Sequence, residues 1–399
     1  STTHALTVRR GWVSSHRLIV FQRLICVLSE PLRVVLTTGN YNYIKDGVSL
    51  TLNRLVGWLE RHGVEVLVIA PVAEEPAMEH QGRLLPVPSF AIPTRKEYRI
   101  GRRLTAQLKD EIVRFKPDLF HIAVPDITGH SALALAEKMQ VPAVSSFHTR
   151  FDGYLQYYHL QFLEPWFHKK LRSFYARCEH LYVPSASMMD ELACHGIADN
   201  MRLWTRGVDH DRFSPARRSQ EWRQAHGIAD DDLVIAYAGR LVAEKNMAVM
   251  ARVFAGLKAR GIAHRTILLG DGPEAGWMRK ALPETVFAGF LHGDELATGY
   301  ASSDIFFFPS ITETFGNATL EAMASGLPSV AADATGSRSL VRDGETGFLV
   351  PVDREDQMIE RLVQLLVDGR MRQKFGARAR EIALCEHEWD GIFARLLSD

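Results

Sequence analysis

Two glutamates, Glu313 and Glu321, form an E-x7-E pair that follows the apolar segment 305–308. That segment predicts a buried strand, Gly316 predicts a turn after it, and residues 318–324 predict a helix. A helix N-terminus favours negative charge. The first carboxylate would face sugar hydroxyls from the loop, and the second, about two helical turns further on, could accept hydrogen bonds from another hydroxylated ring. The pattern therefore predicts a site for an anionic, hydroxyl-rich ligand such as a nucleotide sugar, with a solvated helix face and a helix cap as the alternative.

Two cations, Arg240 and Lys245, follow the apolar segment 233–237, which predicts another strand. A departing nucleoside diphosphate carries negative charge. A guanidinium can neutralise that charge with a fork of donors, and an ammonium can do so as a compact point charge. We therefore predict that Arg240 and Lys245 bind a diphosphate, with surface ion pairing as the alternative.

Two glycine-containing turns stand where ligands bind in open α/β sheets. Gly47 lies between a strand predicted at 33–37 and a helix predicted at 49–62. Its N–H and the helix dipole could support the diphosphate. Gly272 belongs to a Gly-x-Gly turn after the strand predicted at 266–269, where a nucleotide could approach, and a lone turn of this kind is a weak signal.

Composition excludes some classes of partner. The 399 residues include 47 basic and 47 acidic side chains, so the net charge is zero and nothing favours nucleic-acid binding. The four cysteines lie far apart without the spacing of a zinc site, which fits a reducing compartment. We therefore expect a cytoplasmic protein without structural zinc.

The first thirty residues contain the longest apolar stretch near a terminus. Segments 18–21 and 24–28 are separated by Gln22 and Arg23, so they do not reach the roughly 18 to 20 apolar residues of a membrane span. This region could form a helix on a membrane surface. The alternatives are a segment that packs on the domain, a disordered extension, or residues before the true translation start.

From Leu32 onward, short apolar segments alternate with segments of helical periodicity, which predicts a doubly wound α/β architecture. The chain is longer than one core usually supports, so we expect two domains. Turn residues at 205–215 mark a crossing between them and a plausible hinge. Further predicted strands lie at 64–69, 119–122, 143–146, 180–183 and 329–331. The predicted parts are an N-terminal extension at 1–30, an acceptor domain at 31–208, a donor domain at 209–380 and a C-terminal helix at 381–399.

Several segments resemble one family of enzymes. Segments 309–317 and 320–328 closely resemble the donor-site signature of the retaining glycosyltransferases of family 4. Segment 238–246 is similar to the phosphate-binding segment of that family, and segment 145–154 is similar to its strand-end histidine motif. The resemblance covers roughly residues 31 to 399. It implies the GT-B fold, in which two Rossmann-like doubly wound domains face each other across a cleft and the last helix crosses back to the N-terminal domain.

The resemblance also implies roles for individual residues. His148 would lie beside the sugar at the reaction centre, whereas a lone histidine at a strand end is usually structural. The family more often has two adjacent glycines where this chain has Asp46 and Gly47. The implied catalytic residues are His148, Arg240, Lys245 and Glu313. The implied donor-binding residues are Gly47, Gly239, Gly272, Thr314, Phe315, Gly316, Asn317 and Glu321.

The implied reaction is sugar transfer from a UDP-sugar or GDP-sugar with retention at the anomeric carbon and without a cofactor. We expect front-face displacement, in which the departing phosphate takes the acceptor proton and the protein supplies positioning and anion stabilisation. Asp230, Asp231 and Asp232 match a DxD pattern with which a different glycosyltransferase fold holds a metal. Because they precede the strand at 233–238, we predict a polar turn there and a metal-independent reaction.

The acceptor is less constrained by the sequence. Segment 93–104 combines cations with apolar and aromatic residues and suits anionic lipid head groups, with a solvated basic helix as the alternative. Segment 204–209, with the segments around His148 and Glu313, resembles the branch of sulfoquinovosyl, mannosyl and glucuronosyl lipid transferases. We therefore expect transfer of a hexosyl or uronosyl group to a membrane lipid such as diacylglycerol or ceramide, at the inner face of a membrane. The alternatives are a soluble sugar or polysaccharide acceptor, an epimerase without an acceptor, and a non-catalytic nucleotide-sugar sensor.

Overall fold

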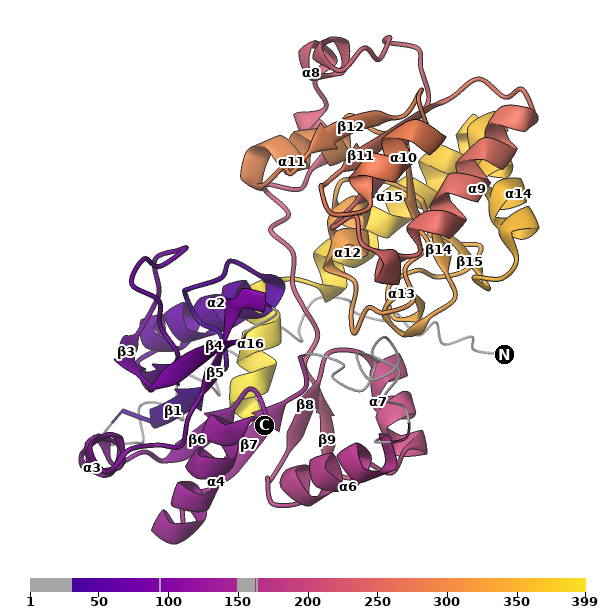
Figure 1. Ribbon diagram of the computed structural model, residues 1–399. Coiled ribbons are helices and arrows are strands. Elements are labelled where there is room, and N and C mark those ends of the chain that lie inside the picture. Colours follow the sequence, from indigo (N-terminus) through magenta and orange to yellow (C-terminus); the bar gives the residue numbers. More distant parts are fainter. Residues whose placement is uncertain (1–30, 93–94, 149–161, 163) are drawn as a thin grey trace, which may run out of the picture. The chain divides into compact units, whose positions relative to one another are not determined.

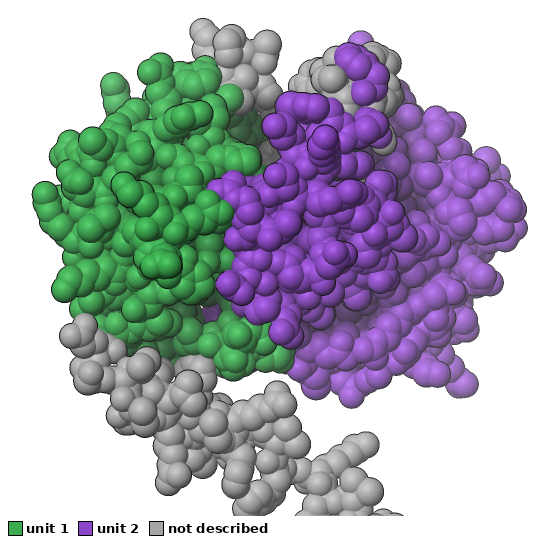
Figure 2. All heavy atoms as spheres, turned by 90° about the horizontal axis from the view of Figure 1, so that it is seen from below, with its two compact units in different colours: residues 1–145, 394–399 green, residues 146–393 purple. Residues whose placement is uncertain are grey.

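The computed structural model describes residues 31–92, 95–148, 162 and 164–399 (Figure 1). The chain divides into two compact units, which Figure 2 shows in different colours. Unit 1 comprises residues 1–145 and 394–399, and unit 2 comprises residues 146–393. The domain boundaries expected from the sequence stay predictions, and the expectations for residues 1–30 lie outside the described residues.

Unit 1 contains parallel strands in the order β3-β2-β1-β6-β7, with helices between them. Its strands are β1 (Arg33–Thr37), β2 (Glu65–Ala70), β3 (Arg83–Pro86), β6 (Leu119–Ile122) and β7 (Ala143–Ser146), whose last residue begins unit 2. Its helices are α2 (Gly47–Arg61), α3 (Ala106–Phe115) and α4 (Ile127–Met139). Strands β1, β6 and β7 coincide with the predicted segments, and all but the first residue of β1 and of β6 are buried within a parallel sheet.

The segment proposed for lipid contact in unit 1 forms a strand and not a helix. Strands β4 (Ser89–Ile92) and β5 (Arg95–Gly101) pair antiparallel. Residues 93–94 lie outside the described part. The alternative of a solvated basic helix is therefore wrong, since cross-strand pairing with β4 takes up the backbone groups of β5.

Unit 2 opens with a small parallel pair and two helices. Strands β8 (Leu181–Val183) and β9 (Met201–Leu203) pair in parallel. Helix α6 (Glu164–Tyr175) precedes β8, and α7 (Ala186–Cys194) connects β8 to β9. The crossing segment that follows β9 has no helix or strand until the short 3-10 helix η2 (Pro215–Arg217). Gly207 packs there against the ring of Trp389, and a Cβ at this position would lie 2.5 Å from the ring. Close packing therefore explains this glycine without invoking a hinge.

The larger part of unit 2 is a six-stranded parallel sheet in the order β12-β11-β10-β13-β14-β15. Its strands are β10 (Val234–Ala238), β11 (Arg265–Leu269), β12 (Val286–Gly289), β13 (Ile305–Phe308), β14 (Ser329–Ala332) and β15 (Gly347–Val350). Its helices are α8 (Gln220–Ala225), the 3-10 helix η3 (Ala243–Lys245), α9 (Met247–Ala259), α10 (Ala275–Ala281), α11 (Gly293–Ala301), α12 (Asn317–Ala324), α13 (Thr335–Arg338), α14 (Glu355–Val367) and α15 (Gly369–Glu386). The chain thus carries two Rossmann-like parallel sheets, as the alternating pattern predicted.

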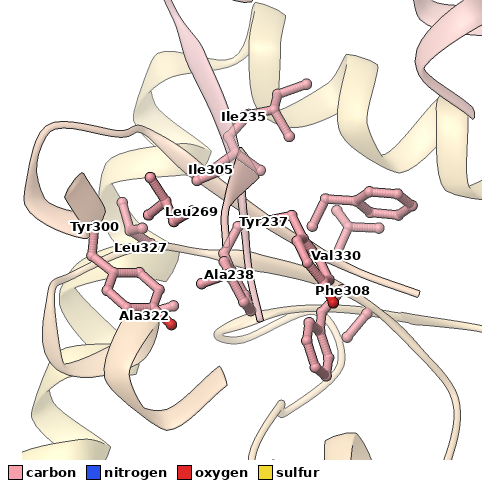
Figure 3. Packing of buried hydrophobic residues seen from close by; sticks show 14 of the residues in the cluster. Ile235, Tyr237, Ala238, Leu269, Tyr300, Ile305, Phe308, Ala322, Leu327 and Val330 are labelled. Carbon is pink, nitrogen blue, oxygen red and sulfur yellow. The ribbon is translucent and has the colours of Figure 1, made fainter. Parts of the chain in front are cut away.

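The core of unit 2 lies around the two central strands of this sheet. Every residue of β10 and β13 is buried, because helices pack on both faces of the sheet. Figure 3 shows Ile235, Tyr237 and Ile305 within this packing, together with Tyr300 and Phe308. Helices α9 and α14 pack against each other, as do α12 and α15 (Figure 1). A rigid sheet of this kind fixes where the loops at the carboxyl ends of its strands begin.

The C-terminal segment differs from the single helix predicted at 381–399. Helix α15 continues to Glu386, and a separate helix, α16, runs from Trp389 to Ser398. At the break, the backbone N–H of Val208 donates to the carbonyl of His387 at 2.9 Å. The helix is interrupted where this carbonyl bonds to the crossing segment. The division of the chain assigns residues 394–399 to unit 1.

Candidate functional site

The carboxyl ends of the central strands in unit 2 bring Lys245 and Glu313 together. Lys245 ends η3 after β10, and Glu313 lies in the loop after β13. The Lys245 ammonium pairs with Glu313 Oε1 and lies 3.3 Å from Thr312 Oγ1. The hydroxyl of Ser310 also donates to Glu313 Oε1, at 3.3 Å. Each side chain of the pair is about a fifth exposed, at 21% and 23%, so a ligand can reach them.

Arg240 lies on the same loop as Lys245, two residues beyond β10, and is exposed. Its carbonyl accepts a 3.0 Å hydrogen bond from the hydroxyl of the buried Tyr237. Burial raises the pKa of Tyr237, and the carboxylates of Glu313 and Glu244 raise it further, so this hydroxyl stays a donor. Tyr237 therefore holds the loop, while the Arg240 guanidinium has no ion pair with any residue that the structure describes.

The glycines of this loop permit close backbone packing. Gly239 has φ of 142°, and Gly270 and Gly272 would each clash through a Cβ with the backbone of the loop at Gly239 and Leu241. The N–H of Leu241 donates to the carbonyl of Asp271 at 3.0 Å, which ties the two loops together. Packing therefore explains Gly272, and its predicted contact with the donor stays a prediction.

Helix α12 begins with an open N-terminus. Its N-cap residue, Gly316, has φ of 101°, and no side chain accepts a hydrogen bond from the first turn. Asn317, the first helical residue, is exposed. The hydroxyl of Thr319 is buried and has no hydrogen-bond partner among the described residues. Free N–H groups and the helix dipole make this end suitable for an anion.

The second glutamate of the pair is held differently from the first. Glu321 Oε2 accepts a 3.1 Å hydrogen bond from the hydroxyl of Tyr300, which is completely buried. Burial raises the pKa of Tyr300 well above its usual value, and Glu321 raises it further. This tyrosine fixes the Glu321 carboxylate, whereas the Glu313 carboxylate is held by Lys245 and Ser310.

Helix α13 packs directly against the Glu313 loop. A Cβ at Gly336 would lie 2.5 Å from Glu313 Cβ and 3.1 Å from the carbonyl oxygen of Phe315. Phe315 itself is buried, with its ring edge-on to His387 at 5.7 Å between centroids. Gly336 therefore lets the backbone of α13 approach the loop, and Phe315 supports the loop from the core.

His148 lies within unit 2 beside the same loop. The hydroxyl of Thr314 donates to the His148 carbonyl at 3.3 Å. The ring is mostly buried, at 9% exposed, with Nε2 2.9 Å from Ser146 Oγ and Nδ1 2.6 Å from an Arg206 nitrogen. The structure thus brings together His148, Thr314 and the Glu313 loop. The motif at residues 145–154 continues beyond His148 into residues outside the described part.

Helix α7 contributes residues that the sequence motifs did not indicate. Ser185 donates to the carbonyl of Thr314 at 3.0 Å, and Ser187 donates to the carbonyl of Thr335. The hydroxyl of Thr335 donates to Glu191 Oε2 at 2.7 Å. The sequence allows Ser185 to be recognised as a helix N-cap. Its contact with Thr314, more than a hundred residues later in the chain, cannot be predicted from a local pattern.

Gly47 belongs to unit 1, where it is the first residue of α2. The Asp46 carboxylate accepts hydrogen bonds from the N–H groups of Val48 and Ser49, at 3.0 and 2.8 Å. The N–H of Asp46 in turn donates to Ser49 Oγ at 3.0 Å, which completes a capping box. The N-terminus of α2 therefore already carries an anion, and the predicted role of Gly47 stays a prediction.

The aspartates of the DxD pattern lie in a turn before β10, as predicted. Asp232 Oδ2 accepts a 2.8 Å hydrogen bond from the N–H of Ala229, and Arg265 lies 3.8 Å from the same oxygen. Within the described residues, no group of three or more His, Cys, Asp or Glu side chains could hold a metal ion. No helix of the described part is long and apolar enough to cross a membrane.

Two family models match consecutive parts of the chain. The model described as Glycosyltransferase Family 4 matches residues 45–212, and the model described as Glycosyl transferases group 1 matches residues 218–382. The junction lies near the predicted boundary at residue 208. The first model begins after β1, and the second spans all six strands of the six-stranded sheet.

Three curated relatives align with most of the chain. A GDP-mannose-dependent alpha-mannosyltransferase of Corynebacterium glutamicum is 31% identical, over 92% of this chain and 88% of the relative. Sulfoquinovosyl transferase SQD2 of Arabidopsis thaliana is 35% identical, over 89% of this chain and 70% of the relative. Alpha-monoglucosyldiacylglycerol synthase of Acholeplasma laidlawii is 25% identical, over 84% of this chain and 88% of the relative.

Among solved structures, Anabaena Alr3699/HepE in complex with UDP-glucose matches with a TM-score of 0.68. The match covers 92% of this chain and 99% of the other chain, at 18% sequence identity. The likeness shows the GT-B fold, as the sequence resemblance implied.

Proposed function

Because the chain belongs to the family 4 glycosyltransferases, we propose that it moves a hexosyl or uronosyl group from a nucleoside diphosphate sugar to a membrane lipid. The observation that carries the proposal is the pair of Lys245 and Glu313 at the carboxyl ends of β10 and β13, with the exposed Arg240 on the same loop as Lys245. Ligands of open α/β sheets bind at this edge. The uncapped N-terminus of α12 begins in the same loop as Glu313.

The donor diphosphate is the expected partner of the two cations. Lys245 is paired with Glu313, whereas the Arg240 guanidinium has no ion pair among the described residues. An arriving diphosphate would bind Arg240 by its fork and compete with Glu313 for the Lys245 ammonium. That exchange would release the Glu313 carboxylate to accept hydrogen bonds from sugar hydroxyls. The name of the Corynebacterium glutamicum relative supports a nucleotide sugar as the donor, and we propose uridine as its base, with guanosine as the alternative.

We propose transfer with retention at the anomeric carbon and without a metal ion. The bond from the anomeric carbon to the phosphate oxygen breaks as the acceptor oxygen attacks from the same face. The departing phosphate takes the acceptor proton, so both proton and charge are accounted for. Arg240, Lys245 and the N–H groups of α12 would stabilise the negative charge that develops on the phosphate.

A lipid acceptor is supported by relatives and by the surface of α6. One relative is a glucosyldiacylglycerol synthase by name. On α6, Trp166 is 59% exposed, and the nearby Phe162 is 74% exposed. Lys169 and Lys170 are exposed on the same helix, with the Lys170 ammonium 5.7 Å from the centre of the Trp166 ring. Exposed aromatic rings beside lysines suit the interface of an anionic membrane.

The experiment that tests the function is release of nucleoside diphosphate from a panel of UDP-sugars and GDP-sugars. Each donor is offered with diacylglycerol or ceramide in detergent, with soluble sugars, or with no acceptor, and Glu313→Ala serves as the blank. We expect release that requires one donor and one lipid. The product should have the same anomeric configuration as the donor, and release should persist in EDTA.

The other outcomes separate the alternatives. Release with soluble sugars but with no lipid would move the acceptor to a sugar or polysaccharide precursor. Donor binding without release under any condition would favour a nucleotide-sugar sensor. Consumption of the donor sugar without an acceptor and without release would indicate an epimerase.

Vesicle binding tests the membrane surface separately. Trp166→Ala combined with Lys169→Glu and Lys170→Glu should weaken binding to phosphatidylglycerol vesicles at least about tenfold, because each cation contributes about 1 kcal/mol near an anionic surface. Helix α10 offers a control, since Trp277 is 38% exposed there but donates to Glu274. Trp277→Ala with Lys280→Glu should bind vesicles like the wild type. Equal loss in both variants would argue against α6 as the lipid-facing surface.

A further inference from the structure

Arg206 is a buried cation that none of the sequence motifs assigned to the site. It is 6% exposed, and burial lowers its pKa to about 10, so it still carries its charge at neutral pH. No carboxylate forms an ion pair with it in the part of the chain that the structure describes. A buried charge without a counterion costs free energy unless its donors are well satisfied. The arrangement of those donors therefore shows what Arg206 does.

The shortest hydrogen bond of Arg206 goes to the predicted catalytic histidine. Its terminal nitrogen lies 2.6 Å from His148 Nδ1, while a second nitrogen is 3.4 Å from the carbonyl of Trp204. The guanidinium also lies over the Trp204 ring, 4.9 Å from its centre. Because a guanidinium can only donate, Nδ1 must accept. The imidazole is then neutral, with its proton on Nε2, which lies 2.9 Å from Ser146 Oγ.

The backbone of Arg206 is fixed from the opposite side. Its carbonyl oxygen lies 2.9 Å from His387 Nδ1, and the N–H of Val208 donates to the carbonyl of His387 at 2.9 Å. Gly207 brings this segment against the ring of Trp389. The backbone that carries the Arg206 side chain is therefore held in place, which limits how far the guanidinium can move from the ring of His148.

A second buried arginine shows the difference between a structural and a positioning role. Arg223 is completely buried, and its guanidinium donates at 2.7 Å to the carbonyls of Ser302, Ala229 and Asp232. It also lies 3.7 Å from the carboxylate of Asp304. Arg223 thus joins backbone segments and has a counterion. Arg206 gives its shortest bond to a side chain of the candidate site.

We infer that Arg206 is the positioning residue for His148, holding the imidazole neutral and its ring oriented at the predicted reaction centre. The inference rests on the proposed function of His148. Among the described residues, the charged or titratable groups near this ring include Arg206 on its Nδ1 side and His387 behind Arg206. Glu313 precedes Thr314, whose hydroxyl binds the His148 carbonyl, and is itself paired with Lys245. Protonation of Nδ1 would place a second cation against Arg206.

The test combines kinetics with nitrogen NMR of the full-length protein. Arg206→Met removes the charge and the donor, Arg206→Lys keeps the charge without the fork, and His148→Gln assigns the His148 signals. With an active donor and acceptor, we expect Arg206→Met to lower kcat about 10- to 100-fold, because the variant loses one hydrogen bond made by a charged group. The KM for the donor should stay within about twofold of the wild-type value. Arg206→Lys should recover part of that loss.

The NMR arm needs no substrate and separates this inference from the proposed function. In the wild type, Nδ1 of His148 should stay unprotonated to a lower pH than in Arg206→Met. The acid limb of the plot of kcat against pH should likewise lie at a lower pH in the wild type than in Arg206→Met. Wild-type kcat together with an unchanged His148 titration in Arg206→Met would overturn the inference. If Arg206→Met does not fold, the test rests on Arg206→Lys, and a wild-type kcat in Arg206→Lys would overturn the inference. Lack of transfer by the wild type would count against the proposed function alone.

Discussion

Helices in the two halves of the chain differ in whether a side chain caps their N-terminus. Helices α2, α3, α4 and α7, from the first half of the chain, each begin with a side chain that accepts from the first turn. Helices α9, α10, α11, α12, α13 and α14, around the six-stranded sheet, begin without one, whereas α8 and α15 of the same unit are capped by Ser219 and Asp368. The capping side chains in the first half are those of Asp46, Thr105, Asp126 and Ser185.

This difference indicates which sheet is prepared for an anion. A capping oxygen satisfies the free N–H groups of a helix and occupies the place where a bound anion would lie. Where the cap is missing, the N–H groups and the dipole stay available to a ligand. Arg240 and Lys245 lie at the same edge as the uncapped helices. We therefore expect the donor diphosphate at the six-stranded sheet, and the capped helices to matter for stability.

The largest effect is expected from removing the cations at the uncapped edge. Arg240→Ala and Lys245→Ala should each lower kcat/KM by about 10²- to 10³-fold, because each loses a group that stabilises charge on the departing phosphate. Steady-state kinetics with the active donor measures the loss. Lys258→Ala is the matched control, since Lys258 is exposed and pairs with Glu284 at 2.7 Å. Near-normal turnover in both Arg240→Ala and Lys245→Ala would contradict a donor site at the uncapped edge of the six-stranded sheet.

The position of these two cations after β10 follows from local patterns, while their role in donor binding stays a prediction. Strands β10 and β13 are apolar runs, and a loop that follows a central parallel strand must emerge at the ligand-binding edge. Lys245 and Glu313 were assigned separate roles from separate motifs. Their direct pairing depends on β10 and β13 being neighbours in the sheet, which no local pattern specifies.

The cap of α4 should make stability depend on pH in a defined direction. Burial raises the pKa of Asp126 to about 6 from 3.8, against hydrogen bonds from backbone N–H groups that lower it. The folded protein therefore retains this proton between pH 4 and 6, where the unfolded chain has lost it. The contribution of Asp126 to stability is fully present below about pH 4 and is lost as pH rises through about 6.

Urea unfolding of the wild type and Asp126→Asn across pH 4 to 7 measures this contribution. The unfolding free energy of the wild type relative to Asp126→Asn should fall over that range, by at most about 3 kcal/mol. Asp333→Asn is a control, because Asp333 is partly exposed and pairs with Arg338. A difference that is constant with pH, or that rises, would contradict the direction of the Asp126 shift.

A new cap at the uncapped edge should weaken donor binding. Ala334 is the N-cap residue of α13 and has an extended backbone, with φ of −141° and ψ of 167°, which suits a capping side chain. Ala334→Asp would place a carboxylate near the Glu313 loop. We expect donor KM to rise about tenfold by repulsion of the diphosphate.

Ala334→Asn provides the neutral comparison, because it offers a cap of similar shape without the charge. It should change donor KM by less than about threefold. If Asn and Asp raise KM equally, the effect is steric and the electrostatic difference between the two sheets is not supported.

The smallest effect is expected from deleting a cap in unit 1. Thr105 Oγ1 accepts from the N–H of Leu108 at 3.2 Å at the start of α3. Thr105→Ala should lower the unfolding free energy by about 1 kcal/mol, and donor KM should stay unchanged. Denaturant unfolding and donor kinetics on the same preparation measure both. A change in donor KM would show that the capped helices also affect the donor site.

Local sequence patterns did not predict several other features of the structure. Strands β12 and β15 were not predicted, since β12 is only half-buried and β15 begins with Gly347, so neither shows a run of fully buried apolar residues. The contacts of Ser185 and Ser187 with Thr314 and Thr335 join residues more than a hundred positions apart. Gly207 packs against Trp389, which is distant in sequence, so this contact has no local signal, and the hinge predicted from the turn residues at 205–215 stays a prediction. Tertiary packing decided each of these.

Calorimetric titration with UDP and GDP tests the central claim most directly. We predict that one of the two nucleotides binds the wild type, that Arg240→Ala weakens its affinity at least about tenfold, and that Thr105→Ala leaves it unchanged. Wild-type affinity in Arg240→Ala, or equal weakening in both variants, would contradict a donor site at the uncapped edge of the six-stranded sheet.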